Sequence, residues 1–324
     1  MTAMYADNAP RHVASKGGVE SYFLRCNHPT EPKALWLKAT VLVPDRGEPV
    51  AEAWIARFDG DRSTASKITI PLAQARFTPG ATVHITIGDH TFALGPAGGS
   101  VRGPTYDLHY TAVPGLSDAL CPFPARWMID GPFPKSKLLT PVPCARFSGT
   151  LDGAAVTDWI GMQGHNWGKS HALEYAWGQC VFLAADGAPH ALCEGFTGRI
   201  KLGPVVTPRL SALVVRRGSR EYRFDRVFRP WRSSADLDGR TWTLRVRGED
   251  GEAVLAMHAE TSRMVCLGYN NPDGALSYCL NSKLARTVLR VNPVDGEGFE
   301  CTSAHGGALE FLTRTPDAAF PEVV

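Results

Sequence analysis

Hydrophobic and polar residues alternate over short runs along most of the chain, and long helical periods are scarce. The clearest alternating runs are residues 35–43 (LWLKATVLV), 51–58 (AEAWIARF), 82–87 (TVHITI) and 241–246 (TWTLRV). Such alternation is typical of strands with one buried face. Turn-forming residues separate the runs, as at Pro44–Gly47 and Asp59–Asp61. Strand and turn recur about every 8–12 residues, which predicts an all-β sandwich or barrel.

Three segments depart from this pattern. Residues 71–75 and 281–288 are predicted to be short helices. From Pro114 to Pro143 the chain is rich in proline and aromatic residues. Proline cannot donate a hydrogen bond to a sheet, so this segment is predicted to be an ordered connector or lid rather than a central strand. We place a domain boundary near residue 143, with a barrel and the connector in residues 1–143 and a second barrel in residues 144–324.

The two halves show a weak internal parallel. The strand Leu35–Lys38 and its hairpin to Glu52–Trp54 resemble the strand Tyr175–Gly178 and its hairpin to Cys193–Gly195. In each half an aromatic strand leads through a turn with Asp to a strand with Glu. Two β-hairpins also match by chance, so the parallel leaves duplication and coincidence both open.

Composition narrows the class of protein. The chain has 324 residues, of which 44% are hydrophobic and 20% charged, with a net charge of +2. This balance, without basic runs interleaved with aromatics, argues against a nucleic-acid partner. The N-terminus has no apolar signal-peptide core, and no apolar run approaches membrane-spanning length. The sequence therefore predicts a soluble, cytoplasmic protein, with peripheral membrane contact left open and oligomeric state undetermined.

The cysteines and standard motifs give no support for a metal or a cofactor. Eight cysteines occur, but no CxxC or CxxxxC pair does. Several lie in apolar stretches, so buried free thiols are expected rather than a disulfide framework. The glycine-rich segment Gly95–Gly99 lacks the lysine and helix of a phosphate loop, and no GxSxG or HExxH motif occurs.

The most distinctive segment runs from Asp158 to Lys169 and places His165, Asn166 and two tryptophans between glycines. His165 is suited to move a proton near neutral pH, and Asn166 is suited to orient it or to polarise a substrate oxygen. The tryptophans would form an apolar or cation-stabilising wall. The alternative is a buried turn in which the histidine bonds to backbone and the tryptophans fill the core.

Other candidates lie on apolar strands. Glu20, Glu52 and Glu194 follow or interrupt such strands, and a carboxyl group in an apolar cavity has a raised pKa and can protonate an alkene or a carbonyl. The alternative is a solvated or arginine-paired carboxylate. Glu194 joins His165 and Asn166 as a catalytic candidate. The candidate substrate-binding residues are aromatic: Trp36, Trp54, Trp127, Trp159, Trp167, Tyr175 and Trp177.

The segment Gly164–Gly168, with the strands Ala34–Lys38 and Pro143–Gly149, resembles the lipocalin-like superfamily of carotenoid 1,2-hydratases (hydroxyneurosporene synthases), AttH-like proteins and tocopherol cyclases. The resemblance implies two linked antiparallel lipocalin-like β-barrels over nearly the whole chain. The group includes hydratases, cyclases, pericyclase-like proteins and members with no known activity. This chain is shorter than a typical tocopherol cyclase.

The leading hypothesis is a cofactor-independent enzyme acting on an apolar, isoprenoid-like or polyketide-like molecule. Its reaction would be proton-initiated hydration or cyclisation, the work of a hydro-lyase or an intramolecular cyclase. The rival is a non-catalytic protein that binds lipid or another hydrophobic ligand in the same cavity; a purely structural or chaperone-like role is a third option. A carboxylate or histidine facing the cavity favours the enzyme, and a wholly apolar lining favours the carrier.

Overall fold

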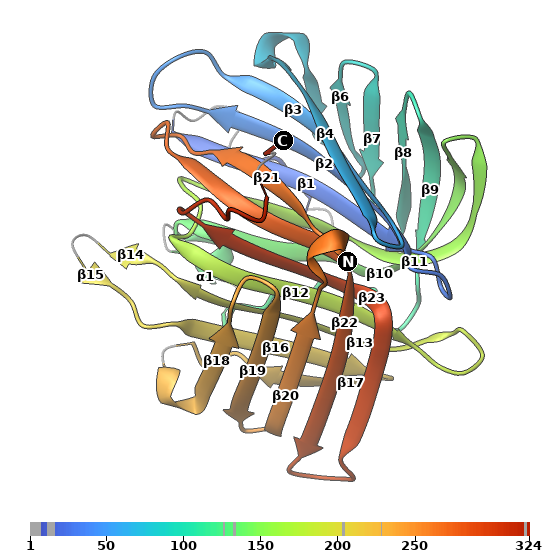
Figure 1. The fold of residues 1–324 in the computed structure, drawn as a ribbon, viewed down its shortest axis with the longest axis vertical. Helices are drawn as coiled ribbons and strands as arrows, with labels where there is room; N and C mark the ends of the chain where they lie inside the picture. Colours follow the sequence, from blue (N-terminus) through green and yellow to red (C-terminus); the bar gives the residue numbers. More distant parts are fainter. Residues whose placement is uncertain are drawn as a thin grey trace.

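Two curled antiparallel sheets make up nearly the whole protein (Figure 1). The computed structural model describes residues 8–11, 17–125, 127–131, 134–202, 205–227, 229–320 and 323–324. Strands hold 65% of the residues and helices 4%, so the predicted all-β class is confirmed. Each sheet curls into a half-barrel, in agreement with two linked lipocalin-like barrels.

The first sheet has eleven strands in the order β4-β3-β2-β1-β11-β10-β9-β8-β7-β6-β5. Hairpins join β1 to β4, β5 to β9 and β10 to β11 in turn, the proline-rich connector leads from β9 to β10, and β1 pairs with β11 to link the two halves of the sheet. The strands are β1 (Gly18–Asn27), β2 (Lys33–Val43), β3 (Val50–Asp59), β4 (Arg62–Pro71), β5 (Arg76–Thr78), β6 (Val83–Ile87), β7 (His90–Leu94), β8 (Gly98–Gly103), β9 (Tyr106–Ala112), β10 (Ser136–Leu151) and β11 (Ala154–Gly168).

The second sheet has ten strands, nine of them in the order β17-β16-β13-β12-β23-β22-β20-β19-β18, with β21 paired to β22. A separate small hairpin pairs β14 (Lys201–Leu202) with β15 (Val205–Val206). The ten strands are β12 (Glu174–Leu183), β13 (Pro189–Arg199), β16 (Leu210–Arg217), β17 (Arg220–Phe224), β18 (Ser233–Leu237), β19 (Thr241–Gly248), β20 (Gly251–His258), β21 (Val265–Asn270), β22 (Leu276–Pro293) and β23 (Phe299–Thr313).

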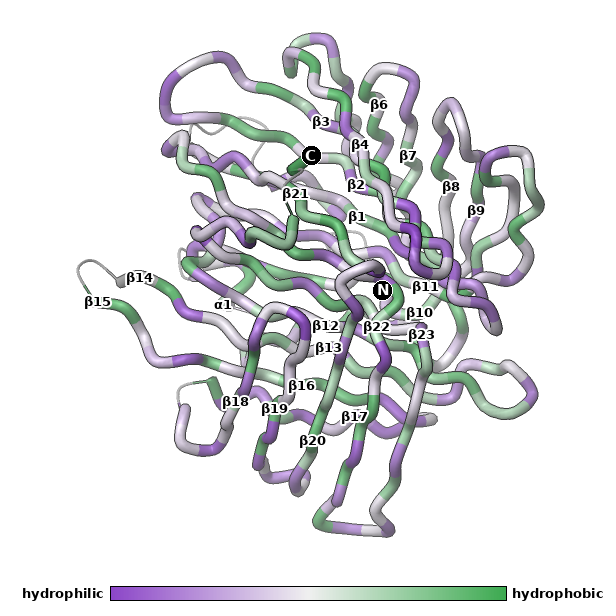
Figure 2. Tube along the Cα trace, in the orientation of Figure 1, coloured by the Kyte–Doolittle hydropathy of each residue, from purple (hydrophilic) through white to green (hydrophobic). Residues whose placement is uncertain are grey.

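The central strands of both sheets are buried on both faces. On β1, Tyr22 and Leu24 pack inside the first half-barrel, whereas Phe23 packs between the two sheets. On β12, Ala176 belongs to the interior of the second half-barrel and Trp177 to the layer between the sheets. Outer strands such as β6 bury one face only, and Figure 2 shows the resulting alternation of hydrophobic and hydrophilic residues. Because successive side chains on a strand point to opposite faces, the two sheets form three apolar layers: one inside each half-barrel and one between the sheets.

Polar side chains also join the sheets. Arg25 on β1 is buried and donates to the carbonyl oxygen of Gly306 (2.9 Å) and to the side chain of Gln179 on β12. Asn27 donates to the carbonyl oxygen of Lys283 on β22 (2.6 Å). Buried polar groups that are satisfied across an interface fix its geometry more tightly than apolar packing alone.

Helices are few and short. They are α1 (Trp127–Asp130) and the 3₁₀ turns η2 (Leu72–Gln74), η3 (Pro230–Arg232) and η4 (Thr261–Arg263). The helix predicted at 71–75 is confirmed as the single turn η2. The helix predicted at 281–288 is wrong, because these residues lie within β22 and pair with β20, β21 and β23. Sheet pairing on both edges outweighs a weak local helical period.

The proline-rich connector is shorter than predicted. Its last part, from Ser136 to Pro143, is the start of β10, which lies between β9 and β11 in the first sheet. The pairing of β10 with β11 shifts register between Leu139 and Val142 and again before Ala145, around Pro141 and Pro143. These irregularities accommodate the missing N–H groups within a central strand. The change from first to second sheet follows Gly168, beyond the predicted boundary near residue 143.

All eight cysteines carry free thiols, and all but Cys121 are buried. Among the described residues, no group of three or more His, Cys, Asp or Glu side chains is arranged to hold a metal ion. Within the same part of the chain, no helix has the length and apolar character needed to cross a bilayer.

Candidate functional site

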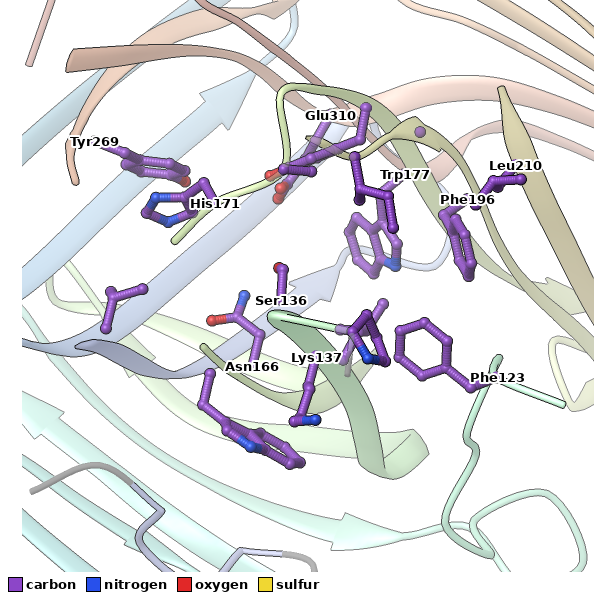
Figure 3. A pocket seen from close by; sticks show the side chains of 18 of the residues that line it. Phe123, Ser136, Lys137, Asn166, His171, Trp177, Phe196, Leu210, Tyr269 and Glu310 are labelled. Atoms are coloured by element: carbon purple, nitrogen blue, oxygen red, sulfur yellow. The ribbon is translucent and has the colours of Figure 1, made fainter. Parts of the chain in front are cut away.

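A pocket of about 160 Å³ lies between the two half-barrels (Figure 3). Phe23 and Trp36 contribute from the first sheet, and Trp177 and Phe196 contribute from the second. Strand alternation explains the lining, because Trp36 and Trp177 lie on the strand faces directed toward the other sheet. Phe123 from the connector adds a further aromatic wall. The pocket is therefore an aromatic cleft at the junction of two sheets, a common place for a small-molecule site.

Besides two tyrosines, four ionisable side chains interrupt this apolar lining: Lys38, Lys137, His171 and Glu310. Lys137 is satisfied by backbone, since its ammonium donates to the carbonyl oxygens of Met128 (3.0 Å) and Gly131 (2.6 Å). Burial lowers the pKa of Lys137. The other three groups have different partners and give the pocket its chemistry.

His171 follows β11 and is oriented by Asn271. Its Nδ1 lies 3.0 Å from Asn271 Oδ1, which also accepts the backbone N–H of His171 (3.3 Å). The Asn271 amide donates to the carbonyl oxygen of Ala275 (2.8 Å) and to Ser277 Oγ (2.9 Å), so its oxygen is directed at the histidine. Because an amide oxygen only accepts, Nδ1 carries the hydrogen and Nε2 is left with its lone pair.

The electrostatics of the pocket keep His171 neutral. Burial, assisted by the positive charge of Lys38, lowers the pKa of His171 to about 4. Its ring stacks on Tyr269 with centroids 5.5 Å apart, and Figure 3 shows the two rings at one end of the pocket. At neutral pH the imidazole is therefore an uncharged base held in one orientation.

The carboxylate of Glu310 on β23 is paired with the ammonium of Lys283. The Lys283 ammonium lies 2.7 Å from Glu310 Oε1, and Asn281 donates to the same oxygen (2.9 Å). Lys283 is fully buried, and burial lowers its pKa while Glu310 acts in the opposite direction. Burial, with the neighbouring Cys279 and Glu310, raises the pKa of Tyr175 well above its ordinary value. The Tyr175 hydroxyl therefore keeps its proton and serves as a hydrogen-bond donor.

Lys38 on β2 is buried beside these groups. Its ammonium lies 3.8 Å from the ring centroid of Tyr269 and about 6 Å from those of Trp36 and Trp54. Burial lowers the pKa of Lys38, and the nearby Glu310 opposes this effect. The Lys38 ammonium therefore contacts aromatic rings rather than a carboxylate.

Solved structures share this architecture. NE1406 of Nitrosomonas europaea, a candidate AttH protein, matches with a TM-score of 0.55 at 14% identity, covering 91% of this chain and 92% of its own. Kievitone hydratase of Nectria haematococca matches with a TM-score of 0.50 at 10% identity, covering 95% and 94%. The protein therefore shares the double lipocalin-like fold of these two structures. The resemblance in sequence predicted this lipocalin-like fold.

Two sequence relatives match most of this chain, but their names give no activity. Two uncharacterized proteins of Mycobacterium tuberculosis, Rv0493c and MT0513, are each 25% identical over 294 residues, which is 85% of this chain and 82% of theirs. No family model matches the chain.

Within this lipocalin-like fold, His165 and Asn166 lie on opposite faces of β11. Asn166 lines the pocket, whereas His165 is opposite Tyr22 of β1 and stacks on its ring at 4.3 Å. His165 Nε2 lies 2.8 Å from Glu20 Oε1, and both side chains are fully buried. Tyr22 donates its hydroxyl hydrogen to the same oxygen (3.0 Å). This pair therefore does not line the pocket, although the His165 ring lies 4.7 Å from that of Trp167, which does.

Glu194 lies beside the pocket without lining it. Its Oε1 accepts hydrogen bonds from Trp177 Nε1 (3.1 Å) and Thr140 Oγ1 (2.8 Å), while Oε2 is buried without a partner among the described residues. Burial raises the pKa of Glu194 to about 7. The carboxyl group thus holds the Trp177 indole, whose ring forms the pocket wall.

The aromatic candidates divide into three groups. Trp36, Trp167, Tyr175 and Trp177 line the pocket. Trp54 lies one layer behind, with its ring centroid 5.6 Å from that of Tyr269. Trp159 packs with the first half-barrel's core, and Trp127 on α1 is 59% exposed.

Sequence reasoning did not select Lys38, Lys283 or Glu310 for the site, and it considered His171 and Asn271 only as weaker candidates, the first near a cavity wall and the second as a turn cap or a ligand contact. A signal was present for two of them, since each is a charged residue within a largely apolar run: Lys38 in LWLKATV and Glu310 in ALEFL. Lysine and glutamate in the interior of strands are rarely buried unless they have a partner or a role. His171 and Asn271 lie 100 residues apart, and only the fold brings them together.

Proposed function

We propose that this protein is an enzyme that hydrates or cyclises an apolar molecule in the pocket between its half-barrels, by moving protons with its own side chains. One observation carries the proposal: ionisable groups face an otherwise aromatic pocket. Placing such groups in an apolar site is unfavourable for binding a wholly apolar ligand, so a carrier of such ligands gains nothing from them. The same fold occurs in kievitone hydratase, whose name assigns a hydration reaction to that protein.

His171 is the proton-moving group in this proposal. Its neutral Nε2 is suited to accept a proton from water, or from a hydroxyl group of the substrate, as the oxygen bonds to one carbon of a double bond. The same proton then passes to the other carbon, so the reaction consumes no net proton. Asn271 acts as a positioning residue, because it fixes the tautomer and the ring direction.

The remaining residues shape the reaction. Trp36, Trp177 and Tyr269 would hold the apolar body of the substrate in a fixed orientation in the pocket. Glu194 positions Trp177. His165, which is buried and paired with Glu20, has a structural role in this account.

Solvent-hydrogen labelling tests the proposal. Small molecules extracted from the purified protein would be identified by mass spectrometry and incubated with fresh enzyme in D₂O. Hydration is expected to add one water and to leave one deuterium on carbon, and cyclisation to leave one deuterium without added water. A hydrophobic-ligand carrier would return the same molecule with no deuterium on carbon, and that result would contradict the enzymatic proposal.

A further inference from the structure

The ionisable groups of the pocket differ in whether they have a hydrogen-bond or ion-pair partner. Glu310 is paired with Lys283, Lys137 is bonded to two backbone carbonyls, and His171 is neutral. Lys38 is 4% exposed, and within the described residues its ammonium has no hydrogen-bond acceptor and no ion-pair partner. One positive charge in the pocket is therefore left without a counter-charge at hydrogen-bond distance.

Aromatic contact compensates this charge in part. The ammonium lies 3.8 Å from the Tyr269 centroid, and such cation–π contacts are favourable when desolvated. A buried charge without a counter-ion is unfavourable, and a bound anion would remove this cost. A further donor in the pocket lacks a partner: the buried indole Nε1 of Trp36 has no acceptor among the described residues.

We propose that the pocket binds amphiphilic molecules with an apolar body and one oxygen that is anionic when bound (a carboxylate or phenolate) or becomes anionic during the reaction (a carbonyl that turns into an enolate), and that this oxygen pairs with the ammonium of Lys38. The body would lie along Phe23, Trp177 and Phe196, which are apolar neighbours in the same pocket. This inference rests on the proposed function for the location of the site, and it names the substrate class. A pure hydrocarbon would leave Lys38 unpaired.

The same lysine then has a place in the reaction. When water adds to a double bond conjugated to a carbonyl, its oxygen bonds to the far carbon and its proton goes to His171 Nε2. The double-bond electrons move onto the carbonyl oxygen, which becomes an enolate next to Lys38. Return of the proton from His171 to the near carbon restores the carbonyl. Lys38 would thus stabilise the charge that develops in the transition state.

Paired fluorescent probes test the recognition. Binding of cis-parinaric acid and of its methyl ester would be measured by energy transfer from the pocket tryptophans, for wild type and for Lys38→Met, Lys38→Arg and Lys67→Met. Lys67 is a matched control, since it also lies over Trp54 (4.4 Å) but does not line the pocket. A nitrophenol with an alkyl chain, ionised at neutral pH, and its methyl ether form the phenolate arm.

Wild type is expected to bind the ionised probe of at least one arm roughly ten- to a hundredfold tighter than its neutral partner, the range for a hydrogen bond to a charged group. Lys38→Met should abolish that preference and keep neutral-probe binding, which also reports a folded pocket. Lys38→Arg and Lys67→Met should keep it. Equal binding of ionised and neutral probes by wild type, or an unchanged preference in Lys38→Met, would overturn the inference alone. Failure of every probe to bind wild type would contradict the assignment of the pocket as a binding site, and with it the proposed function.

Discussion

Replacing His171 with glutamine is expected to lower turnover roughly 10²–10⁴-fold and to leave the fold intact, since general acid–base groups contribute about this much. Glutamine keeps a donor for Asn271 Oδ1 but has no basic nitrogen. The variant should therefore still bind ligand. Single-turnover kinetics and thermal unfolding on the same preparation measure both properties.

His165→Gln is the matched control. It removes a hydrogen bond between two fully buried groups, so it should lower the free energy of unfolding by roughly 1–3 kcal/mol and leave turnover per folded molecule near that of wild type. The reverse pattern, with activity lost in His165→Gln and kept in His171→Gln, would move the catalytic role to His165.

The pH profile separates a base from a merely structural histidine. Because the pKa of His171 is lowered to about 4, its neutral form persists well below the pH at which an ordinary histidine charges, and turnover should fall only near pH 4. Asn271→Asp places a negative charge beside the ring, which favours the imidazolium and should shift the acid limb to higher pH. An unshifted limb would contradict the positioning role of Asn271.

Glu194→Gln is expected to change how stability depends on pH. The pKa of Glu194 is raised to about 7 in the folded protein from 4.5, so the folded state binds more protons than the unfolded state between these values. Its contribution to stability is present below pH 4.5 and is lost as pH rises through 7. Between pH 5 and pH 8 this single group should remove roughly 2–3 kcal/mol from wild type.

Denaturant unfolding of wild type and Glu194→Gln at several pH values measures this effect, because the difference between the two cancels the other titrating groups. The free energy of unfolding of Glu194→Gln should therefore increase relative to that of wild type as pH rises. Thr140→Val is a companion variant: it removes a hydrogen bond that lowers the pKa of Glu194, so the folded pKa should rise further and the loss of stability should continue to higher pH than in wild type. A difference independent of pH would show that Glu194 titrates normally.

The pattern of the sequence was sufficient for the fold class because most strands follow simple rules. Outer strands such as β6 alternate as one-sided strands do, and turn residues mark the hairpins. Central strands are harder to interpret, since burial on both faces removes the alternation, as in β1. Residues 281–288 of β22 also lack a clear alternation, and they were therefore predicted to be a helix. The prolines before Pro143 were predicted to belong to a connector, whereas they lie in a strand with irregular register.

The site was only partly predictable for a related reason. Asn166, Trp167, Tyr175 and Trp177 come from one stretch of the chain, and sequence reasoning selected them as a group. The face on which each side chain lies depends on strand register, which separates His165 from Asn166 although they are neighbours in sequence. Lys38 and Glu310 meet the group only through the packing of one sheet on the other, and no local pattern encodes that contact.

The most direct test of the account is a crystal structure of the protein with the molecule that it binds. The account predicts electron density between the two sheets, with the apolar body along Trp36 and Trp177. A polar oxygen should lie within hydrogen-bond distance of Lys38 Nζ, and the reacting carbon should face His171 Nε2. Density inside the first half-barrel instead, against His165 and Tyr22, with the pocket between the sheets filled by solvent, would contradict it.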